Sequence, residues 1–137
     1  MTIPYLACMA SAAVFYHLPP RVLPSIQAVE GGRPGLVHIN QDGSRDLGVM
    51  QVNTRWVRPL AWQTRMPPAE ARQRLLLDPC FNIAVAGAIM RIYLNEAEGN
   101  LLRAVGYYHS HSAPLANAYR LRVVASAARL FGGDGQR

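Results

Sequence analysis

The chain has 137 residues, half of them hydrophobic, and a net charge of +6. Its fourteen basic residues are all arginine. This length and composition predict one globular domain with a substantial core and exclude an intrinsically disordered protein. No apolar run approaches the roughly 20 residues of a transmembrane helix, so we do not expect an integral membrane protein. The arginines are scattered, without interleaved aromatics, and no zinc-ligand spacing is present, so we do not expect a nucleic-acid partner.

The N-terminal segment predicts a helix over residues 3–16. Its apolar residues Leu6, Ala10 and Ala13 follow helical spacing, and the helix is expected to end before Pro19. The segment vaguely resembles a signal peptide, but it lacks a basic start. We therefore interpret it as the first helix of the domain, with any export signal absent or already removed.

The second predicted helix, residues 21–30, carries a carboxylate on its apolar face. Leu23, Ile26 and Glu30 share one side of the helix, and two glycines that end it follow directly. Burial and the negative end of the helix dipole both favour the protonated form, which makes Glu30 a candidate proton donor near neutral pH. A solvated glutamate at a helix end is the alternative, and this segment alone leaves both open.

A polar, β-like excursion follows over residues 31–53, and its turn residues predict a small β-hairpin or an irregular loop. Gly48 would let the backbone come close to a ligand or to another segment. Gln51 and Asn53, two apart in an extended piece, would point the same way and offer amide groups suited to hydroxyl- and acetamido-rich ligands. Either amide could instead hold the hairpin to the helices.

The remaining chain predicts helices. They are expected from Asn53 through Leu60 and over residues 69–76, 79–98, 101–110 and 115–131. The long helix begins at an Asp-Pro pair and is apolar on most sides, so it should be the central core helix. The predicted fold class is mainly α, with a single domain over residues 1–131 and a disordered tail over 132–137.

Two cysteines, Cys8 and Cys80, lack metal-ligand spacing and could form a disulfide between helices or remain buried free thiols. An extracellular-type function would favour the disulfide. The four histidines form no HExxH or comparable pair and no Ser-His-Asp arrangement. We therefore expect no metal site and no cofactor.

Three short motifs carry a family resemblance: residues 26–32 (IQAVEGG), 48–53 (GVMQVN) and 104–110 (AVGYYHS). Their order and approximate spacing resemble those of the soluble lytic transglycosylases, over about residues 8–123. The Glu-Gly-Gly and Tyr-His-Ser forms are most similar to the specialised enzymes of type IV secretion, conjugation and pilus systems. The resemblance implies a helical domain like goose-type lysozyme that cleaves the β-1,4 bond between N-acetylmuramic acid and N-acetylglucosamine in peptidoglycan.

The resemblance also implies roles for individual residues, with Glu30 as catalytic acid and base and Tyr108 standing near it. The substrate-binding residues that it implies are Gly48, Met50, Gln51, Asn53, Tyr108 and His109. Two positions depart from the family pattern. Many relatives have Ser where this chain has Gly31, and many have Asn where it has His109, so side-chain contacts made by those family residues are not transferred.

Most glycosidases use two carboxylates, and Asp46 is the only other one that its motif places near the cleft. The family resemblance implies a scheme with one carboxylate. Glu30 protonates the leaving oxygen while the 2-acetamido group of the substrate stabilises the anomeric centre. Glu30 then takes the proton of the muramoyl 6-hydroxyl, which closes a 1,6-anhydro ring. We expect Asp46 to brace the hairpin turn, with a second catalytic group as the alternative.

The predicted function is thus a lytic transglycosylase that acts on peptidoglycan strands in the periplasm or outside a bacterial cell, although no export signal is evident. Its candidate partners are components of a type IV secretion, conjugation or pilus machine. The alternatives are a hydrolytic muramidase and a non-catalytic wall-binding module. A carboxylate on an apolar helix face argues against the binding module, which has no need for one.

Overall fold

The computed structural model describes residues 2–132, which form a mainly α domain with one small antiparallel sheet. The helices are α1 (Leu6–Phe15), α2 (Val22–Glu30), α3 (Val57–Thr64), α4 (Pro68–Leu77), α5 (Pro79–Glu96), α6 (Leu101–His109) and α7 (Ala113–Ala127). The strands are β1 (Val37–Ile39), β2 (Arg45–Leu47) and β3 (Val52–Asn53), and two short turns, η1 (Thr54–Trp56) and η2 (Ala128–Gly132), precede α3 and extend α7. The predicted lysozyme-like, mainly α class is confirmed.

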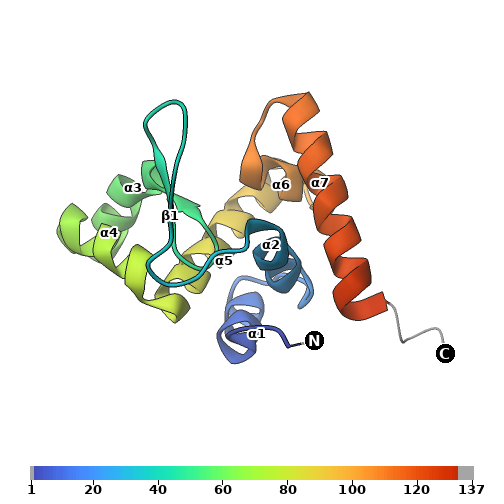
Figure 1. Cartoon of the computed structure of the whole chain (residues 1–137), viewed down its shortest axis with the longest axis horizontal. Coiled ribbons are helices and arrows are strands. Elements are labelled where there is room, and N and C mark those ends of the chain that lie inside the picture. Colours follow the sequence, from blue (N-terminus) through green and yellow to red (C-terminus); the bar gives the residue numbers. More distant parts are fainter. Residues whose placement is uncertain (1, 133–137) are drawn as a thin grey trace.

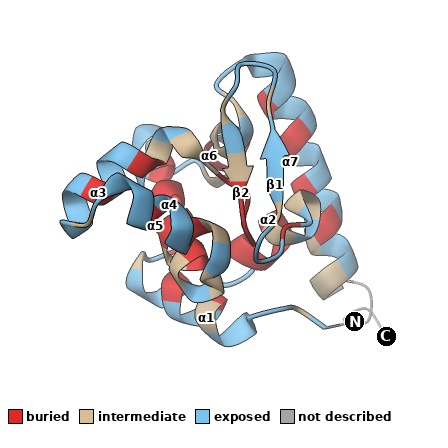
Figure 2. Cartoon of the chain, turned by 60° about the vertical axis from the view of Figure 1, so that its left-hand side comes forward, coloured by how far each residue is buried: buried red, intermediate tan, exposed pale blue. Residues whose placement is uncertain are grey.

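Helix α5 is the centre of the domain, as its sequence predicts. It runs between the part that contains the sheet, α3 and α4 and the part formed by α1, α2, α6 and α7 (Figure 1). Ile83, Ala86 and Met90 are fully buried along it, and buried residues concentrate on α5 and on the sides of the other helices that face it (Figure 2). Gly87 is required where Tyr16 crosses the helix, because an added Cβ would lie 2.9 Å from the tyrosine ring.

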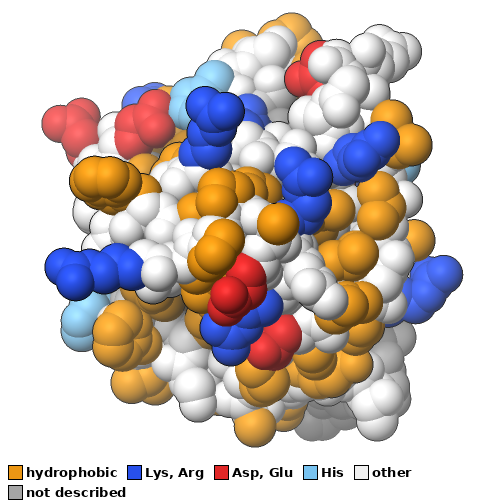
Figure 3. Space-filling model, turned by 90° about the vertical axis from the view of Figure 1, so that its left-hand side faces the viewer, with side chains coloured by type: hydrophobic (Ala, Val, Ile, Leu, Met, Phe, Trp, Pro, Cys, Tyr) orange, Lys and Arg blue, Asp and Glu red, His pale blue; other side chains and the backbone are white. Residues whose placement is uncertain are grey.

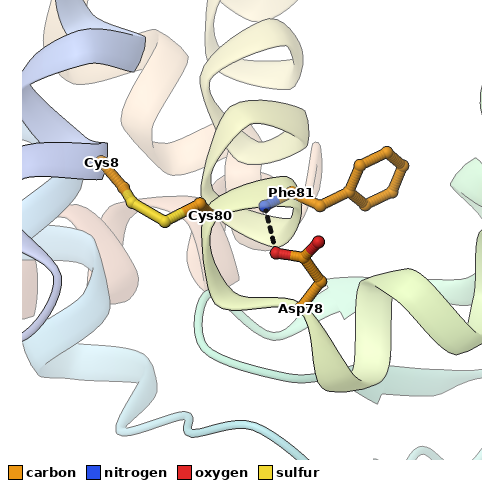
Figure 4. The surroundings of a disulfide bond; sticks show 4 residues. All are labelled: Cys8, Asp78, Cys80 and Phe81. Carbon is orange, nitrogen blue, oxygen red and sulfur yellow. Dashed lines mark hydrogen bonds between the residues drawn. A yellow bond between two sulfur atoms is a disulfide. The ribbon is translucent and has the colours of Figure 1, made fainter.

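A disulfide joins α1 to the first turn of α5. Cys8 and Cys80 are bonded with their Cα atoms 5.4 Å apart, which confirms the first of the two alternatives drawn from the sequence (Figure 4). Cys80 itself is exposed, so the bond is open to solvent on that side. The same turn is capped by Asp78, whose Oδ1 accepts a hydrogen bond of 3.0 Å from the backbone N–H of Phe81.

The sheet has the strand order β1-β2-β3, and both pairs are antiparallel. In this register Asp46 on the middle strand lies opposite His38 on one side and Asn53 on the other. The sheet is too small to have two covered faces, so these polar side chains stay at its surface. The register therefore brings one carboxylate, one imidazole and one amide together beside the end of α2.

Within residues 2–132 no single helix is long and apolar enough to cross a membrane, although the sharply bent pair of α4 and α5 meets the requirement for length and composition when the two are taken together. The tail predicted over residues 132–137 lies outside the described residues, apart from Gly132 at the end of η2.

Candidate active site

A polar cavity of about 190 Å³ opens between the sheet and the helices. One wall comes from the sheet and η1, and the other from the ends of α2 and α6 and from the middle of α5. The residues that line it are Glu30, Asn40, Asp42, Ser44, Asp46, Gln51, Val52, Asn53, Arg55, Trp56, Ile89, Tyr108 and His109. Six of the eight residues that the sequence predicts for the site line this cavity: Glu30, Asp46, Gln51, Asn53, Tyr108 and His109.

Glu30 is the last residue of α2, and the two glycines after it have different functions. Gly31 ends the helix in the left-handed conformation, with φ 65°, and its N–H donates to the Gln27 carbonyl at 2.7 Å. At Gly32 an added Cβ would collide with the carbonyl oxygens of Gly48 and Val49. The Glu-Gly-Gly sequence therefore both stops the helix and lets the chain after Glu30 press against the 48–50 segment.

The carboxyl group of Glu30 is half-buried and is held by one direct hydrogen bond. The Tyr119 hydroxyl of α7 donates to Oε2 at 2.6 Å. Burial raises the pKa of Glu30, and the negative charge of Asp46 raises it further; the hydrogen bond from Tyr119 and the positive charge of Arg122 oppose this rise without cancelling it. Glu30 thus combines contact with the cavity, a fixed orientation and a carboxyl group that keeps its proton to higher pH than an ordinary glutamate.

Tyr108 lines the cavity, but its hydroxyl does not donate to Glu30. It donates to the backbone carbonyl of Met50 at 2.8 Å, and burial raises its pKa well above the ordinary value. Tyr108 therefore stays a neutral donor that ties α6 to the 48–50 segment across the cavity floor. It is near the candidate acid, as the sequence predicts, and its ring forms part of the cavity wall.

Asn82 of α5 fixes the backbone that forms this wall. It is fully buried, and its Nδ2 donates to the carbonyls of Leu47 and Leu75, each at 2.8 Å, while its Oδ1 accepts from the N–H of Met50 at 2.8 Å. Gly48 packs against the same place, with a hypothetical Cβ 2.5 Å from the Leu75 carbonyl and a φ of 71°. The side chain of Met50 is fully buried, so Gly48 and Met50 support the wall from behind and do not line the cavity.

Replacing Asn82 by Ala should lower the free energy of unfolding by about 3 kcal/mol, because three buried hydrogen bonds at roughly 1 kcal/mol each are lost. Chemical denaturation monitored by circular dichroism measures this. Asn95→Ala on the same helix is the matched control, since Asn95 is exposed, and it should change stability by less than about 0.5 kcal/mol. Equal effects of the two changes would contradict the role given to Asn82.

The two amides adopt a different geometry from the extended one expected. Gln51 is buried in the left-handed conformation with φ 53°, and its Nε2 donates to the Gly48 carbonyl at 3.0 Å and to the Leu36 carbonyl at 3.4 Å. Asn53 does not point alongside it but caps η1, accepting from the Arg55 N–H at 2.9 Å. The extended arrangement is wrong because the turn at Gly48 continues through Gln51. Both residues still reach the cavity, but most of their hydrogen bonds stay within the protein.

Asp46 is held on the cavity wall by its neighbours in the sheet. Its Oδ1 accepts from Asn53 Nδ2 at 2.9 Å, and its Oδ2 lies 3.7 Å from Nδ1 of His38. Asn53 Nδ2 also donates to Ser44 Oγ at 3.0 Å, which connects the carboxylate to the hairpin turn. These contacts fit the bracing role expected for Asp46. Asp46 also lines the same cavity as Glu30, which is compatible with the alternative role as a second catalytic carboxylate.

His109, the position where many relatives carry Asn, stacks on the tyrosine that holds Glu30. The rings of His109 and Tyr119 are nearly parallel, at 11°, with their centroids 5.0 Å apart. Burial lowers the pKa of His109, and the positive charge of Arg122 lowers it further. His109 is therefore a neutral ring at physiological pH that covers Tyr119 at the edge of the cavity.

Among residues 2–132 no group of three His, Cys, Asp or Glu side chains comes close enough together to hold a metal ion.

Sequence reasoning missed Tyr119. It lies among the buried residues of α7 and is 2% exposed, a position typical of a packing residue. One signal for it is present in the sequence. A buried tyrosine needs a partner for its hydroxyl, and few buried acceptors can be expected in so apolar a domain. Asn82 and Ser44 were missed too, because a single Asn in a core helix and a single Ser in a turn carry no distinctive pattern.

The chain is similar to known proteins over most of its length. The family model described as "Transglycosylase SLT domain" matches residues 7–126. The protein "Invasion protein IagB" of Salmonella typhimurium strain LT2 is 32% identical over 120 residues, which cover 84% of this chain and 69% of the relative. "Protein IpgF" of Shigella flexneri is 26% identical over 128 residues, covering 90% of this chain and 78% of the relative.

Proposed function

The chain belongs to the transglycosylase SLT family, and from this premise we propose that it is a peptidoglycan lytic transglycosylase. It would cut the β-1,4 bond between N-acetylmuramic acid and N-acetylglucosamine and leave 1,6-anhydro-muramic acid ends. The observation that carries the proposal is the state of Glu30: a half-buried carboxyl group at a polar cavity, with a raised pKa and a fixed orientation from Tyr119.

In the proposed reaction Glu30 acts twice. As an acid it gives its proton to the glycosidic oxygen, and the C1–O bond to the leaving sugar breaks while the carbonyl oxygen of the 2-acetamido group bonds to C1. As a carboxylate it then takes the proton of the 6-hydroxyl, whose oxygen bonds to C1 and displaces the acetamido oxygen. Glu30 ends protonated, as it began. Tyr119 keeps Oε2 in place through both steps, so the other oxygen, Oε1, is the one we assign to proton transfer.

Digestion of purified sacculi tests the proposal. The protein should release soluble fragments whose muramic acid ends resist reduction by borohydride, because a 1,6-anhydro ring has no free aldehyde. Binding without release would support a non-catalytic wall-binding module. Fragments with reducible ends would support a hydrolytic muramidase.

The hydrolytic alternative rests on one observation, that Asp46 lines the same cavity as Glu30. A second carboxylate could direct a water molecule or form a covalent intermediate. Its hydrogen bond from Asn53 and its proximity to His38 favour the bracing role instead, since each carboxylate oxygen has a neighbour within the sheet.

Tyr119→Phe should move the pH profile of cleavage in a defined direction. The tyrosine hydrogen bond stabilises the ionised form of Glu30 and so lowers its pKa; without it the pKa of Glu30 rises further. The alkaline limb of the rate, which reports loss of the proton from the acid, should shift to higher pH, while the maximal rate falls about fivefold because the carboxyl group is less well oriented. Tyr107→Phe is the matched control, since Tyr107 does not line the cavity. An unshifted limb in Tyr119→Phe would contradict the assignment.

The cellular setting follows from the same premise and is also proposed. Peptidoglycan lies outside the cytoplasmic membrane, so the protein would act in the periplasm or after secretion. The similarity of the Glu-Gly-Gly and Tyr-His-Ser motifs to those of the specialised enzymes supports a link to a type IV secretion, conjugation or pilus machine, and one relative is named "Invasion protein". There the enzyme would open the wall locally.

A further inference from the structure

A second feature lies beside the cavity, on the exposed side of α3. A shallow groove there is lined by Arg58, Trp62 and Arg65 together with residues at the start of α4. Trp62 is 86% exposed, the largest exposed fraction among the big hydrophobic side chains of the described residues. Figure 3 looks onto the side where α3 and α4 lie, and basic side chains are scattered there among hydrophobic ones, with a few acidic side chains on the same face.

The groove follows the cavity closely along the chain. Arg55, in η1, lines the cavity, and Arg58 and Trp62, on α3, border the groove at i and i+4, the spacing that puts two side chains on one helix face. Arg65 ends α3 and borders the same groove. We call Arg55, Arg58, Trp62 and Arg65 the arginine–tryptophan track. This track was not predicted, because the arginines are scattered along the sequence.

The arginines of the track are available for an external anion. Within the described residues the ion pairs involve His38, Arg74 and His111, and no carboxylate lies within 4.0 Å of a guanidinium group of the track. All three guanidinium groups belong to exposed residues. The track therefore presents three positive charges around one apolar ring surface, and none of the three is held in a salt bridge within residues 2–132.

We propose that the arginine–tryptophan track binds the peptide stems of the glycan strand whose sugars occupy the cavity. This inference rests on the proposed function, which supplies a polymer with short peptides that carry free carboxylates at regular intervals. Guanidinium groups pair with carboxylates, and Trp62 offers a flat surface to the apolar parts of the same strand. Arg55 at the cavity and Arg58 at the groove are separated by only two residues of the chain, which favours a ligand attached to the substrate over a separate protein.

Co-sedimentation with sacculi tests this, with every protein carrying Glu30→Gln so that nothing is cut. Phosphate polymers are first removed from the sacculi with hydrofluoric acid. Half of the material is then treated with carbodiimide and ethanolamine, which converts stem carboxylates into neutral amides and leaves the glycan intact. Arg58→Gln/Arg65→Gln should weaken binding to untreated sacculi about fivefold. The parent should bind amidated sacculi more weakly than untreated ones. On amidated sacculi Arg58→Gln/Arg65→Gln should bind as well as the parent.

The matched control is Arg103→Gln/Arg129→Gln, which removes two exposed arginines that border neither the cavity nor the groove. It should bind untreated sacculi almost as well as the parent. Thermal unfolding of each variant shows that the fold is kept. The proposal is overturned if Arg58→Gln/Arg65→Gln binds untreated sacculi like the parent. A protein partner would then be the better candidate for this surface. The proposal is also overturned if the loss in this variant is equal on amidated sacculi, or if the control loses as much.

The outcome is separable from that of the proposed function. Binding is measured in the Glu30→Gln background, so it does not depend on cleavage. If the unmodified protein releases no fragments yet the track variants lose carboxylate-dependent binding, the proposed function fails and the track stands. If fragments are released and the track variants bind normally, the track fails alone.

Discussion

Glu30→Gln is expected to lower the rate of peptidoglycan cleavage by about a hundredfold to ten-thousandfold, the range of a lost general acid or base. The upper end is expected here, because one carboxyl group serves both steps of the proposed reaction. Release of soluble fragments from sacculi, followed over time, measures it. Gln keeps the size of Glu and can still accept the hydrogen bond from Tyr119, so the loss would be chemical and not structural.

The same variant should be at least as stable as the parent at neutral pH. Because the folded-state pKa of Glu30 is raised, the folded protein binds more protons than the unfolded one between the ordinary and the raised pKa. Stability therefore falls as pH rises through this window. Glutamine removes that penalty, and the difference between the variant and the parent should disappear at acid pH. A lower melting temperature of Glu30→Gln at neutral pH would contradict the burial argument.

Asp46→Asn is the matched comparison. It keeps an oxygen that can accept from Asn53, and it removes the negative charge that helps to raise the pKa of Glu30. Most of the activity should remain, with the alkaline limb moved to lower pH. A loss as large as that of Glu30→Gln would instead identify Asp46 as a second catalytic carboxylate.

Removing the disulfide should have the largest effect on stability. Cys8 and Cys80 are 72 positions apart, and opening a loop of that length costs about 4 kcal/mol in the chain-entropy model. Cys8→Ser/Cys80→Ser should therefore unfold at a clearly lower denaturant concentration. The loss should not affect the chemistry directly, because neither cysteine lines the cavity.

Reductant provides the control for this prediction. Treating the parent protein with a thiol should bring its unfolding midpoint close to that of Cys8→Ser/Cys80→Ser, and the same treatment should leave the variant unchanged. A parent protein whose midpoint does not respond to reductant, although mass measurement shows that both thiols are reduced, would contradict the stabilising role.

The fold was largely predictable because its signals are local. Helix α5 begins at an Asp-Pro pair and is apolar on most sides, and α2 ends at paired glycines after Glu30. Such signals depend on neighbours along the chain, and the structure follows them to within a few residues. The mainly α class and the β excursion after Glu30 follow from the same kind of reasoning.

The site was predictable only where its residues belong to motifs. The bond between Tyr119 and Glu30 spans 89 positions, and no local pattern reports a contact at that distance. The left-handed turn at Gln51 is equally hidden, because a non-glycine residue with positive φ is held there by surrounding contacts. The arginine–tryptophan track was missed for a related reason: the spacing of Arg58 and Trp62 indicates a binding surface only once this face of α3 is known to be exposed.

In the proposed reaction the oxygen that attacks C1 comes from the substrate and not from water. Digestion of sacculi in water enriched in oxygen-18 tests this most directly. Mass spectrometry of the released fragments reads the result. We expect muramic acid ends with no heavy oxygen and a mass lower by one water than that of a reducing end. Heavy oxygen at C1 of those ends would mean that water completes the reaction, and the protein would then be a hydrolytic muramidase.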